Sequence, residues 1–149
     1  FLSELVPAEA VDGSPFDDDL GLRWPHRMDR SVTGRPLTVG GITWRRGIGV
    51  HSPSRLTWEL DGTWTALHGS VGIDDEVLSL PHQGAVVFRV IVGDETVWES
   101  PTVRGGEGPR PIPPVDLRGA RGLTLEVDMD AQSFVADRAD WLRLLLVRS

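Results

Sequence analysis

The segment that decides the expected fold is Gly47-Ile48-Gly49-Val50-His51-Ser52-Pro53-Ser54. Its two glycines flank an apolar residue, and glycine permits a close backbone approach that a Cβ atom would block. The following residues, 55–60, alternate polar and apolar side chains, with Leu56 and Trp58 among the apolar ones. This two-residue period is typical of a half-buried strand. We therefore expect a corner between two strands, with His51 as the one polar side chain exposed at its tip.

The rest of the chain carries a similar β pattern. Residues 86–92 read Val-Val-Phe-Arg-Val-Ile-Val, so a strand buried on both faces is expected there, with Arg89 as its only polar member. Turn sequences separate such runs: Gly40-Gly41, Asp61-Gly62 and Gly93-Asp94. The proline-rich residues 101–114 are expected to form an irregular connection at a sheet edge. No stretch has a convincing helix period with caps, which predicts an all-β sandwich or barrel; the alternative is an α+β fold with a short helix near residues 137–141.

Length and composition restrict the class of protein. The chain has 149 residues, enough for one domain, in which we expect residues 1–27 to be a lead-in packed on a sandwich of residues 28–149. Its 15 basic and 22 acidic residues give a net charge of −7, and an acidic domain without a basic stripe is a poor nucleic-acid binder. No apolar run approaches the roughly 20 residues that span a bilayer, so no membrane partner is expected. Because the chain starts at Phe1, we expect an excised piece of a larger multidomain protein.

The sequence offers no catalytic arrangement. Ser52 and Ser54 are not in a Gly-x-Ser-x-Gly elbow, and the four histidines lack a close zinc spacing. Many carboxylates are present, but nothing places a pair across a cleft, as glycosidases require. No glycine-rich loop leads into a helix, as phosphate binding requires. These observations predict a domain that is not an enzyme.

The order of the short motifs resembles the NPCBM family, also classified as carbohydrate-binding module family 51. The motifs run in order: Gly34-Arg35-Pro36-Leu37-Thr38-Val39-Gly40, Trp44, Gly47-Ile48-Gly49-Val50-His51-Ser52, Glu59-Leu60, Val71-Gly72-Ile73-Asp74-Asp75, Phe88-Arg89-Val90, Leu123-Thr124-Leu125 and Asp137-Arg138-Ala139-Asp140-Trp141. No single motif is very specific, but their order is. The resemblance covers about residues 28–147.

This resemblance implies a jelly-roll β-sandwich of the galactose-binding-domain type. It further implies a non-catalytic, extracellular or cell-surface module that binds galactose-containing glycans, is attached to a glycoside hydrolase or surface protein, and often holds a structural calcium ion. Binding loops vary faster than frameworks, so the sugar does not follow from the fold. The alternative is an interaction or spacer domain that has kept the sandwich and lost sugar binding.

Sugar chemistry suggests which residues to consider. Pyranose rings present apolar C–H faces and a rim of hydroxyls, so a site needs an aromatic platform with polar groups beside it. Trp24, next to Pro25 in an expected loop, is the platform candidate; the alternative is that it docks the N-terminal arm onto the sandwich. His51 either bonds a sugar hydroxyl or braces the corner through a backbone carbonyl or Asp137. The other tryptophans are expected to belong to the core or framework: Trp44, Trp58, Trp64, Trp98 and Trp141.

Several aspartates are candidate ligands of a sugar or an ion. Asp74 and Asp75 end an expected strand, where one could cap the following turn and one could face a ligand. Asp29, in an oxygen-rich loop, and Asp137 are the candidates for calcium, which prefers oxygen ligands. The acidic run at residues 17–19 is expected to be a solvated loop, with a hard-cation site as the alternative.

Overall fold

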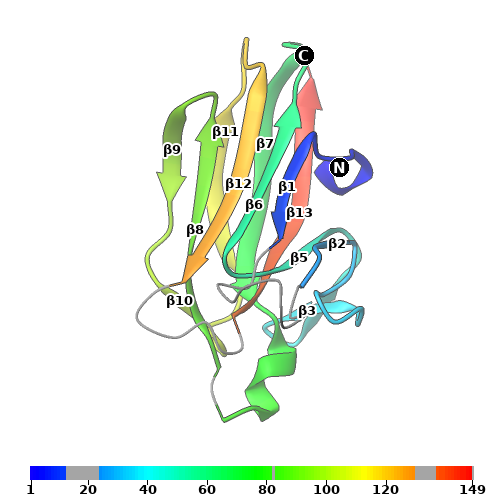
Figure 1. Ribbon diagram of the computed structural model, residues 1–149, viewed down its shortest axis with the longest axis vertical. Coiled ribbons are helices and arrows are strands. Elements are labelled where there is room, and N and C mark those ends of the chain that lie inside the picture. Colours follow the sequence, from blue (N-terminus) through cyan, green and yellow to red (C-terminus); the bar gives the residue numbers. More distant parts are fainter. Residues whose placement is uncertain (13–23, 82, 130–136, 149) are drawn as a thin grey trace.

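The computed structural model describes residues 1–12, 24–81, 83–129 and 137–148, and the acidic run at residues 17–19 lies outside them. The described residues form a β-sandwich whose elements are visible in Figure 1. The strands are β1 (Glu9–Asp12), β2 (Arg27–Met28), β3 (Leu37–Val39), β4 (Ile42–Trp44), β5 (Gly47–His51), β6 (Ser54–Glu59), β7 (Trp64–Ile73), β8 (Ala85–Val92), β9 (Glu95–Glu99), β10 (Val103–Arg104), β11 (Arg110–Asp116), β12 (Gly122–Met129) and β13 (Arg138–Arg148). In the described part of the chain two short 3-10 helices accompany them: η1 (Leu2–Glu4) and η3 (Asp75–Ser79). The predicted all-β class is confirmed.

Two antiparallel sheets face each other. One has the order β1-β6-β12-β8-β10, with β9 paired to β8, and the other has the order β11-β7-β13-β5-β2. The predicted corner joins the sheets, because β5 pairs with β13 in one sheet and β6 pairs with β12 in the other. β1 pairs with β6, so residues before the corner also belong to a sheet.

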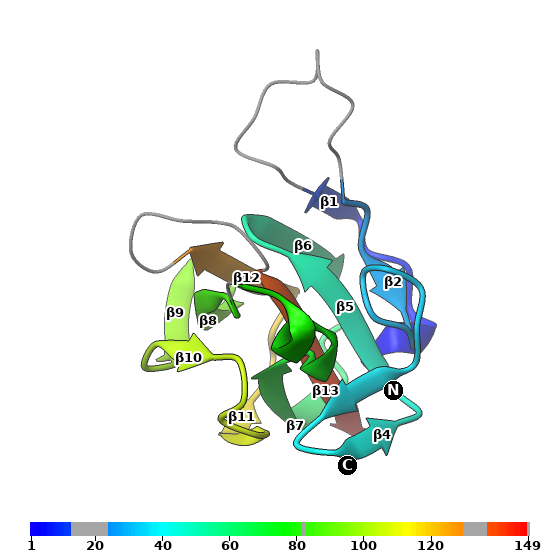
Figure 2. The same cartoon turned by 90° about the horizontal axis from the view of Figure 1, so that it is seen from below.

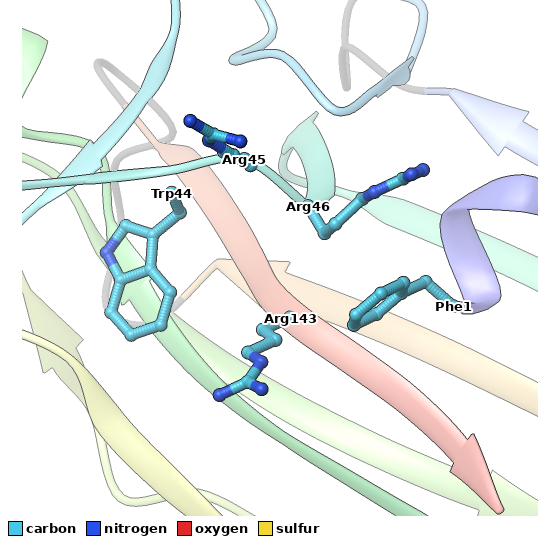
Figure 3. Close-up of a pocket in the computed structure, with 5 residues that line it drawn as sticks. All are labelled: Phe1, Trp44, Arg45, Arg46 and Arg143. Atoms are coloured by element: carbon cyan, nitrogen blue, oxygen red, sulfur yellow. The ribbon is translucent and has the colours of Figure 1, made fainter.

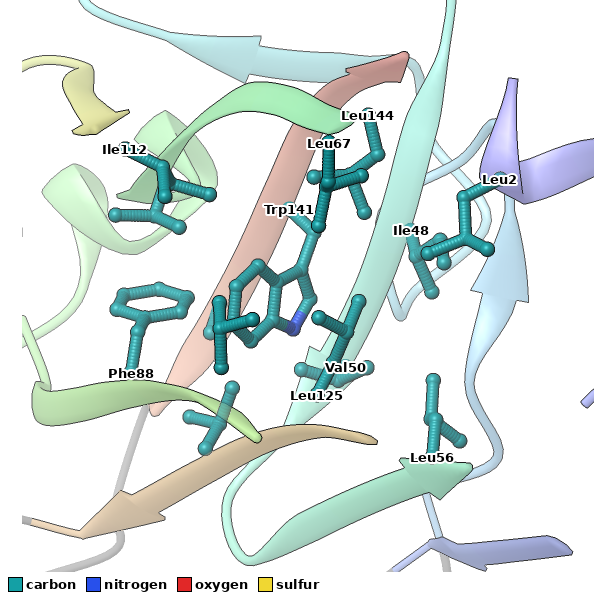
Figure 4. Close-up of a cluster of buried hydrophobic side chains, with 14 of the residues drawn as sticks. Leu2, Ile48, Val50, Leu56, Leu67, Phe88, Ile112, Leu125, Trp141 and Leu144 are labelled. Atoms are coloured by element: carbon teal, nitrogen blue, oxygen red, sulfur yellow. The ribbon is translucent and has the colours of Figure 1, made fainter. Parts of the chain in front are cut away.

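The core lies between the two sheets (Figure 4). Trp141 occupies its centre and meets Phe88 edge to face, with 5.0 Å between ring centroids. Trp58 is also buried, and its indole N–H donates to the Leu5 carbonyl at 2.9 Å, which ties the N-terminal segment to the sheet. Each such fully buried large side chain contributes about 1.5–3 kcal/mol to folding.

The glycines of β5 allow other backbone segments to approach this strand. A Cβ atom on Gly49 would overlap the Arg30 carbonyl oxygen and the backbone of Ser31, and one on Gly47 would overlap the Trp141 carbonyl. All five residues of β5 are buried. The expected role of these glycines is therefore confirmed.

The hairpin β3–β4 lies outside the two main sheets, next to η3. Its own small apolar cluster consists of Leu37, Val39 and Leu142, with Trp44 packed against it. Seen from below in Figure 2, η3 lies across the end of the sandwich beside this hairpin. This end carries most of the candidate site residues.

Residues 138–148 form a strand that pairs with both β5 and β7, so the alternative of a short helix near residues 137–141 does not hold. Three expectations about secondary structure and burial were wrong. The side chain of His51, expected to be exposed at the corner, is buried. The proline-rich region is more regular than predicted, since it contains β10 and the edge strand β11. Three tryptophans read as core are only half-buried: Trp44, Trp64 and Trp98.

Candidate functional site

Trp24 and His51 form a stacked pair at the corner. Their ring centroids lie 5.2 Å apart with an interplanar angle of 15°. Arg138 is the cross-strand partner of His51, so both side chains project from the same face of the sheet. The Arg138 guanidinium carbon lies 5.6 Å from the Trp24 ring centroid. Trp24 therefore covers both polar side chains and remains partly exposed itself.

The chain segment that carries Trp24 is anchored nearby. The His26 backbone N–H donates to Asp12 Oδ1 at 3.0 Å, and the His26 ring nitrogen Nδ1 lies 2.8 Å from the same oxygen. These contacts hold the segment beside the end of β1. An aromatic platform needs such support, because a mobile ring would lose conformational entropy on binding.

His51 is uncharged at neutral pH. Its Nδ1 lies 2.8 Å from the Ser52 carbonyl, which can only accept, so Nδ1 carries the hydrogen and Nε2 keeps its lone pair. Burial lowers the pKa of His51; the Ser52 bond raises it and the nearby Arg138 lowers it further. His51 thus braces the corner through a backbone carbonyl, which was one of the two predicted roles, and it supports the Trp24 ring.

A second polar group lies behind Arg138. Thr33 Oγ1 donates to Glu76 Oε2 at 2.6 Å, and Ser31 Oγ lies 3.3 Å from the same oxygen. Glu76 Oε1 is 3.7 Å from the Arg138 guanidinium, which is an ion pair without a hydrogen bond. Glu76 Oε1 and Arg138 Nε are buried without hydrogen-bond partners among the described residues. In an ordinary structural network, buried polar atoms have hydrogen-bond partners. The Glu76–Arg138 pair differs in that these two atoms have none.

Asp74 and Asp75 are engaged in holding the hairpin. Asp74 caps η3 by accepting from the Glu76 N–H at 3.0 Å and also accepts from the Thr38 N–H at 3.2 Å. Asp75 accepts from the N–H groups of Gly40 and Gly41 at 3.1 and 2.8 Å. One of the two aspartates was predicted to cap the following turn, and Asp74 has this role at the start of η3. Among the described residues, no hydrogen bond or ion pair joins either aspartate to Trp24 or His51.

Asp29 and Asp137, the calcium candidates, are each bound by donors of the protein. Asp29 accepts from Ser3 Oγ at 2.6 Å and from the Gly47 N–H at 3.1 Å. Asp137 accepts from Ser52 Oγ at 2.6 Å and from the Ala85 N–H at 2.9 Å. Within the described ranges, no group of three or more acidic or histidine side chains is arranged to hold a metal ion. Among the described residues neither aspartate therefore belongs to a cluster of acidic ligands, and the calcium ion that the resemblance implies stays a prediction.

Sequence reasoning missed three polar residues of this region: Glu76, Arg138 and Asp140. Asp140 is buried, and burial followed by its contact with Asp74 raises the pKa of its carboxyl well above the usual range. Arg138 could have been found by aligning the closing strand antiparallel to β5, which places it opposite His51. Glu76 carried no such signal, because its position depends on the turn into η3.

The comparisons with known proteins agree with this fold. A family model described as NPCBM/NEW2 domain matches residues 1–147. Alpha-1,3-galactosidase B of Akkermansia muciniphila is 35% identical over 122 residues, which cover 79% of this chain and 15% of that protein. The CBM51 from Clostridium perfringens GH95 in complex with methyl-galactose has a TM-score of 0.84 at 23% identity and covers 99% of this chain and 98% of that one. The structure of CBM51-2 in complex with GlcNAc, with INT domains, from Clostridium perfringens ZmpB has a TM-score of 0.83 at 28% identity, covering 99% of this chain and 30% of that one.

These relatives are carbohydrate-binding modules or enzymes with which the chain shares one part. The chain spans 15% and 7% of the lengths of the curated relatives that it matches. Among the described residues, no helix is long and apolar enough to cross a membrane. The family model covers nearly the whole chain, and the predicted resemblance is confirmed. The chain belongs to the NPCBM/NEW2 domain family and is a non-catalytic carbohydrate-binding module.

Proposed function

We propose that the domain binds galactose-type sugars on the surface formed by Trp24, His51 and Arg138. The observation that carries this proposal is the Trp24 ring, stacked on His51 and still partly exposed. An indole held in this way offers an apolar face to the C–H groups of a pyranose. The names of two relatives support the choice of sugar, since one is a galactosidase and one module was solved with methyl-galactose.

A polar group beside the platform would bind the hydroxyls. The Arg138 guanidinium donates and cannot accept, and its side chain is 22% exposed, so it is the group that reaches a sugar hydroxyl. Glu76 is only 5% exposed, and its carboxylate lies behind Arg138 and holds the guanidinium in place through their ion pair. Binding of this kind involves no chemical step, and an open site predicts affinities of roughly μM to mM.

Calorimetric titration with methyl-galactoside and with GlcNAc tests the proposal. We expect Trp24→Ala to weaken sugar binding about tenfold or more, because the stacking surface is lost. His51→Ala should weaken binding as well, since it removes the support under the ring. The effects of the two substitutions should therefore be less than additive in the double variant.

Trp98→Ala is the matched control, because it removes another half-buried tryptophan, from β9 in the opposite sheet. It should leave sugar affinity unchanged. Sugar binding that survives Trp24→Ala at full strength would place the site elsewhere. A folded wild-type domain that binds neither sugar would instead favour an interaction or spacer domain.

At the level of the whole protein, we propose that the module holds an attached catalytic part close to galactose-bearing glycans. This proposal is supported by two curated relatives that are much longer than this chain. By their names, they are a galactosidase and an N-acetylgalactosaminidase. An extracellular or cell-surface location belongs to the same proposal, since complex glycans of this kind are displayed there. Attachment of the domain to a reporter enzyme and measurement of its retention on a galactose-bearing matrix would test this role.

A further inference from the structure

A second hollow lies at the other end of β5, around Trp44. It has a volume of about 350 Å³, and its lining is Phe1, Trp44, Arg45, Arg46 and Arg143. Figure 3 shows these side chains around the hollow, with two aromatic rings and three guanidinium groups. The volume is at the lower end of the range of small-molecule sites. None of these residues belongs to the Trp24 surface.

Trp44 provides a supported aromatic ring in this hollow. It ends β4, opposite Leu37 in the hairpin, and packs against the small apolar cluster that includes Leu142. Its indole N–H lies 3.5 Å from the Val39 carbonyl. Two neighbouring hollows also use Trp44, one of them with Arg30 and Arg45 and the other with His68 and Arg143. The ring is thus held by its own hairpin and surrounded by open space.

Two of the three guanidinium groups are available to a ligand. Arg46 is already paired, with Glu4 at 3.2 Å and Asp29 at 3.4 Å, and it lies over the Phe1 ring. Arg45 and Arg143 are exposed, and no ion pair or side-chain hydrogen bond joins either of them to another described residue. The acidic groups near the hollow, Glu4 and Asp29, are both used by Arg46.

A local irregularity of the backbone aims Arg143 at the hollow. Two residues of β13, Arg143 and Leu144, face the single residue Gly69 of β7, which makes a β-bulge. Arg143 has a φ of 48°, in the left-handed region that non-glycine residues rarely adopt. Its backbone N–H donates to the Arg46 carbonyl at 2.8 Å, which fixes the bulge against the segment that carries the other two arginines. Such strain is characteristic of positions that serve a ligand.

We propose that this hollow binds a sugar residue that carries a carboxylate or a sulfate group. The sugar ring lies against Trp44, and the anionic group binds the guanidinium groups of Arg45 and Arg143. Planar guanidinium groups match the geometry of both anions and form their strongest hydrogen bonds with them. The proposal goes beyond the binding of neutral galactose, because it gives the module a second, charge-selective site.

The test compares three ligands that differ only at carbon six: galactose, galacturonic acid and galactose 6-sulfate. Binding is measured by calorimetry at low and high salt. We expect at least one of the two acids to bind about tenfold more tightly than galactose at this site, with the difference decreasing at high salt. The two acids separately distinguish a carboxylate preference from a sulfate preference.

Arg143→Gly is the decisive variant, because glycine adopts the positive φ without strain and so removes the guanidinium while preserving the bulge. It should abolish the preference for acids while keeping or raising the melting temperature. Arg45→Gln should reduce the preference, and Arg104→Gln, which removes an equal charge on β10, should not. Trp24→Ala should leave acid binding intact, so failure at one site is distinguishable from failure at the other. Equal binding of all three ligands, or an unchanged preference in Arg143→Gly, would overturn the proposal.

Discussion

At the scale of single residues, the corner shows how hydrogen bonds hold a buried carboxyl. Asp137 is completely buried, and it accepts hydrogen bonds from Ser52 and Ala85. Burial raises the pKa of Asp137 to about 6, and the two hydrogen bonds offset only part of this effect. The carboxyl therefore binds a proton more tightly in the folded chain than in the unfolded chain.

This pKa predicts a pH dependence of stability. Because the folded state holds the Asp137 proton more tightly, its contribution to stability is greatest below the ordinary pKa of 3.8 and is lost as the pH rises through about 6. An asparagine can accept from Ala85 and donate to Ser52, but it does not titrate. Asp137→Asn should thus reduce the loss of stability between these pH values. Urea midpoints of both proteins across this interval check the prediction, and identical pH profiles would contradict it.

His51 illustrates what could be predicted for a single residue. The motif singled it out, and its bond to a backbone carbonyl was one of the expected alternatives. Its burial under Trp24 could not be predicted, because the two residues are far apart in the sequence and no local pattern indicates that they meet.

At the scale of elements, β5 owes its place to the absence of side chains at Gly47 and Gly49. The segment before β3 passes so close to Gly49 that the nearest atoms are backbone atoms of Arg30 and Ser31. Backbone atoms cannot rotate away as the end of a long side chain can. The approach is therefore a rigid constraint on this position.

Gly49→Ala tests this constraint. The added methyl group must displace the Arg30–Ser31 backbone, so we expect a loss of about 2 kcal/mol or more in the free energy of unfolding. Gly122→Ala in β12 is the control, because it meets no atom within 4 Å and its backbone has no positive φ. It should change stability by about 1 kcal/mol at most. Chemical denaturation measures both, and equal effects would refute the role given to the close approach.

The elements also show where pattern reading succeeds and fails. Alternation predicted β6 and β12, and the apolar run predicted β8, because each has a buried face that its residues reveal. β11 was missed, since prolines argue against a strand unless it lies at an edge, as this one does. The half-buried state of Trp44 was not predicted either, because the hydrophobicity of a residue does not reveal that its hairpin lies outside both main sheets.

At the scale of the whole molecule, the sandwich holds two separate aromatic surfaces at the two ends of β5. Trp24 covers His51 at one end of this strand, and the Trp44 hollow begins beside Gly47 at the other. The five residues of β5 span about 13 Å between their first and last Cα atoms. The fold class and family followed from the order of motifs, whereas these surfaces depend on strand register and on one bulge, which short motifs do not encode.

The dependence of the melting temperature on calcium is a property of the whole domain. The melting temperature is measured with calcium and with a chelator, in the wild type and in Asp29→Asn and Asp137→Asn. Because both carboxylates already accept hydrogen bonds from the protein, we expect neither substitution to alter the calcium-dependent shift of the wild type. A shift that disappears in either variant would assign that aspartate to the ion after all.

The bulge in β13 has a consequence for how this strand tolerates changes in length. Trp141 and Leu144 both face the main core although they are three residues apart, which a regular strand would not allow. Deletion of Arg143 would place Trp141 and Leu144 two residues apart, which is the spacing by which a regular strand keeps both side chains on one face. The extra residue of the bulge is thus not needed for the inward direction of Leu144 and Leu146; its consequence is the outward placement of Arg143 itself.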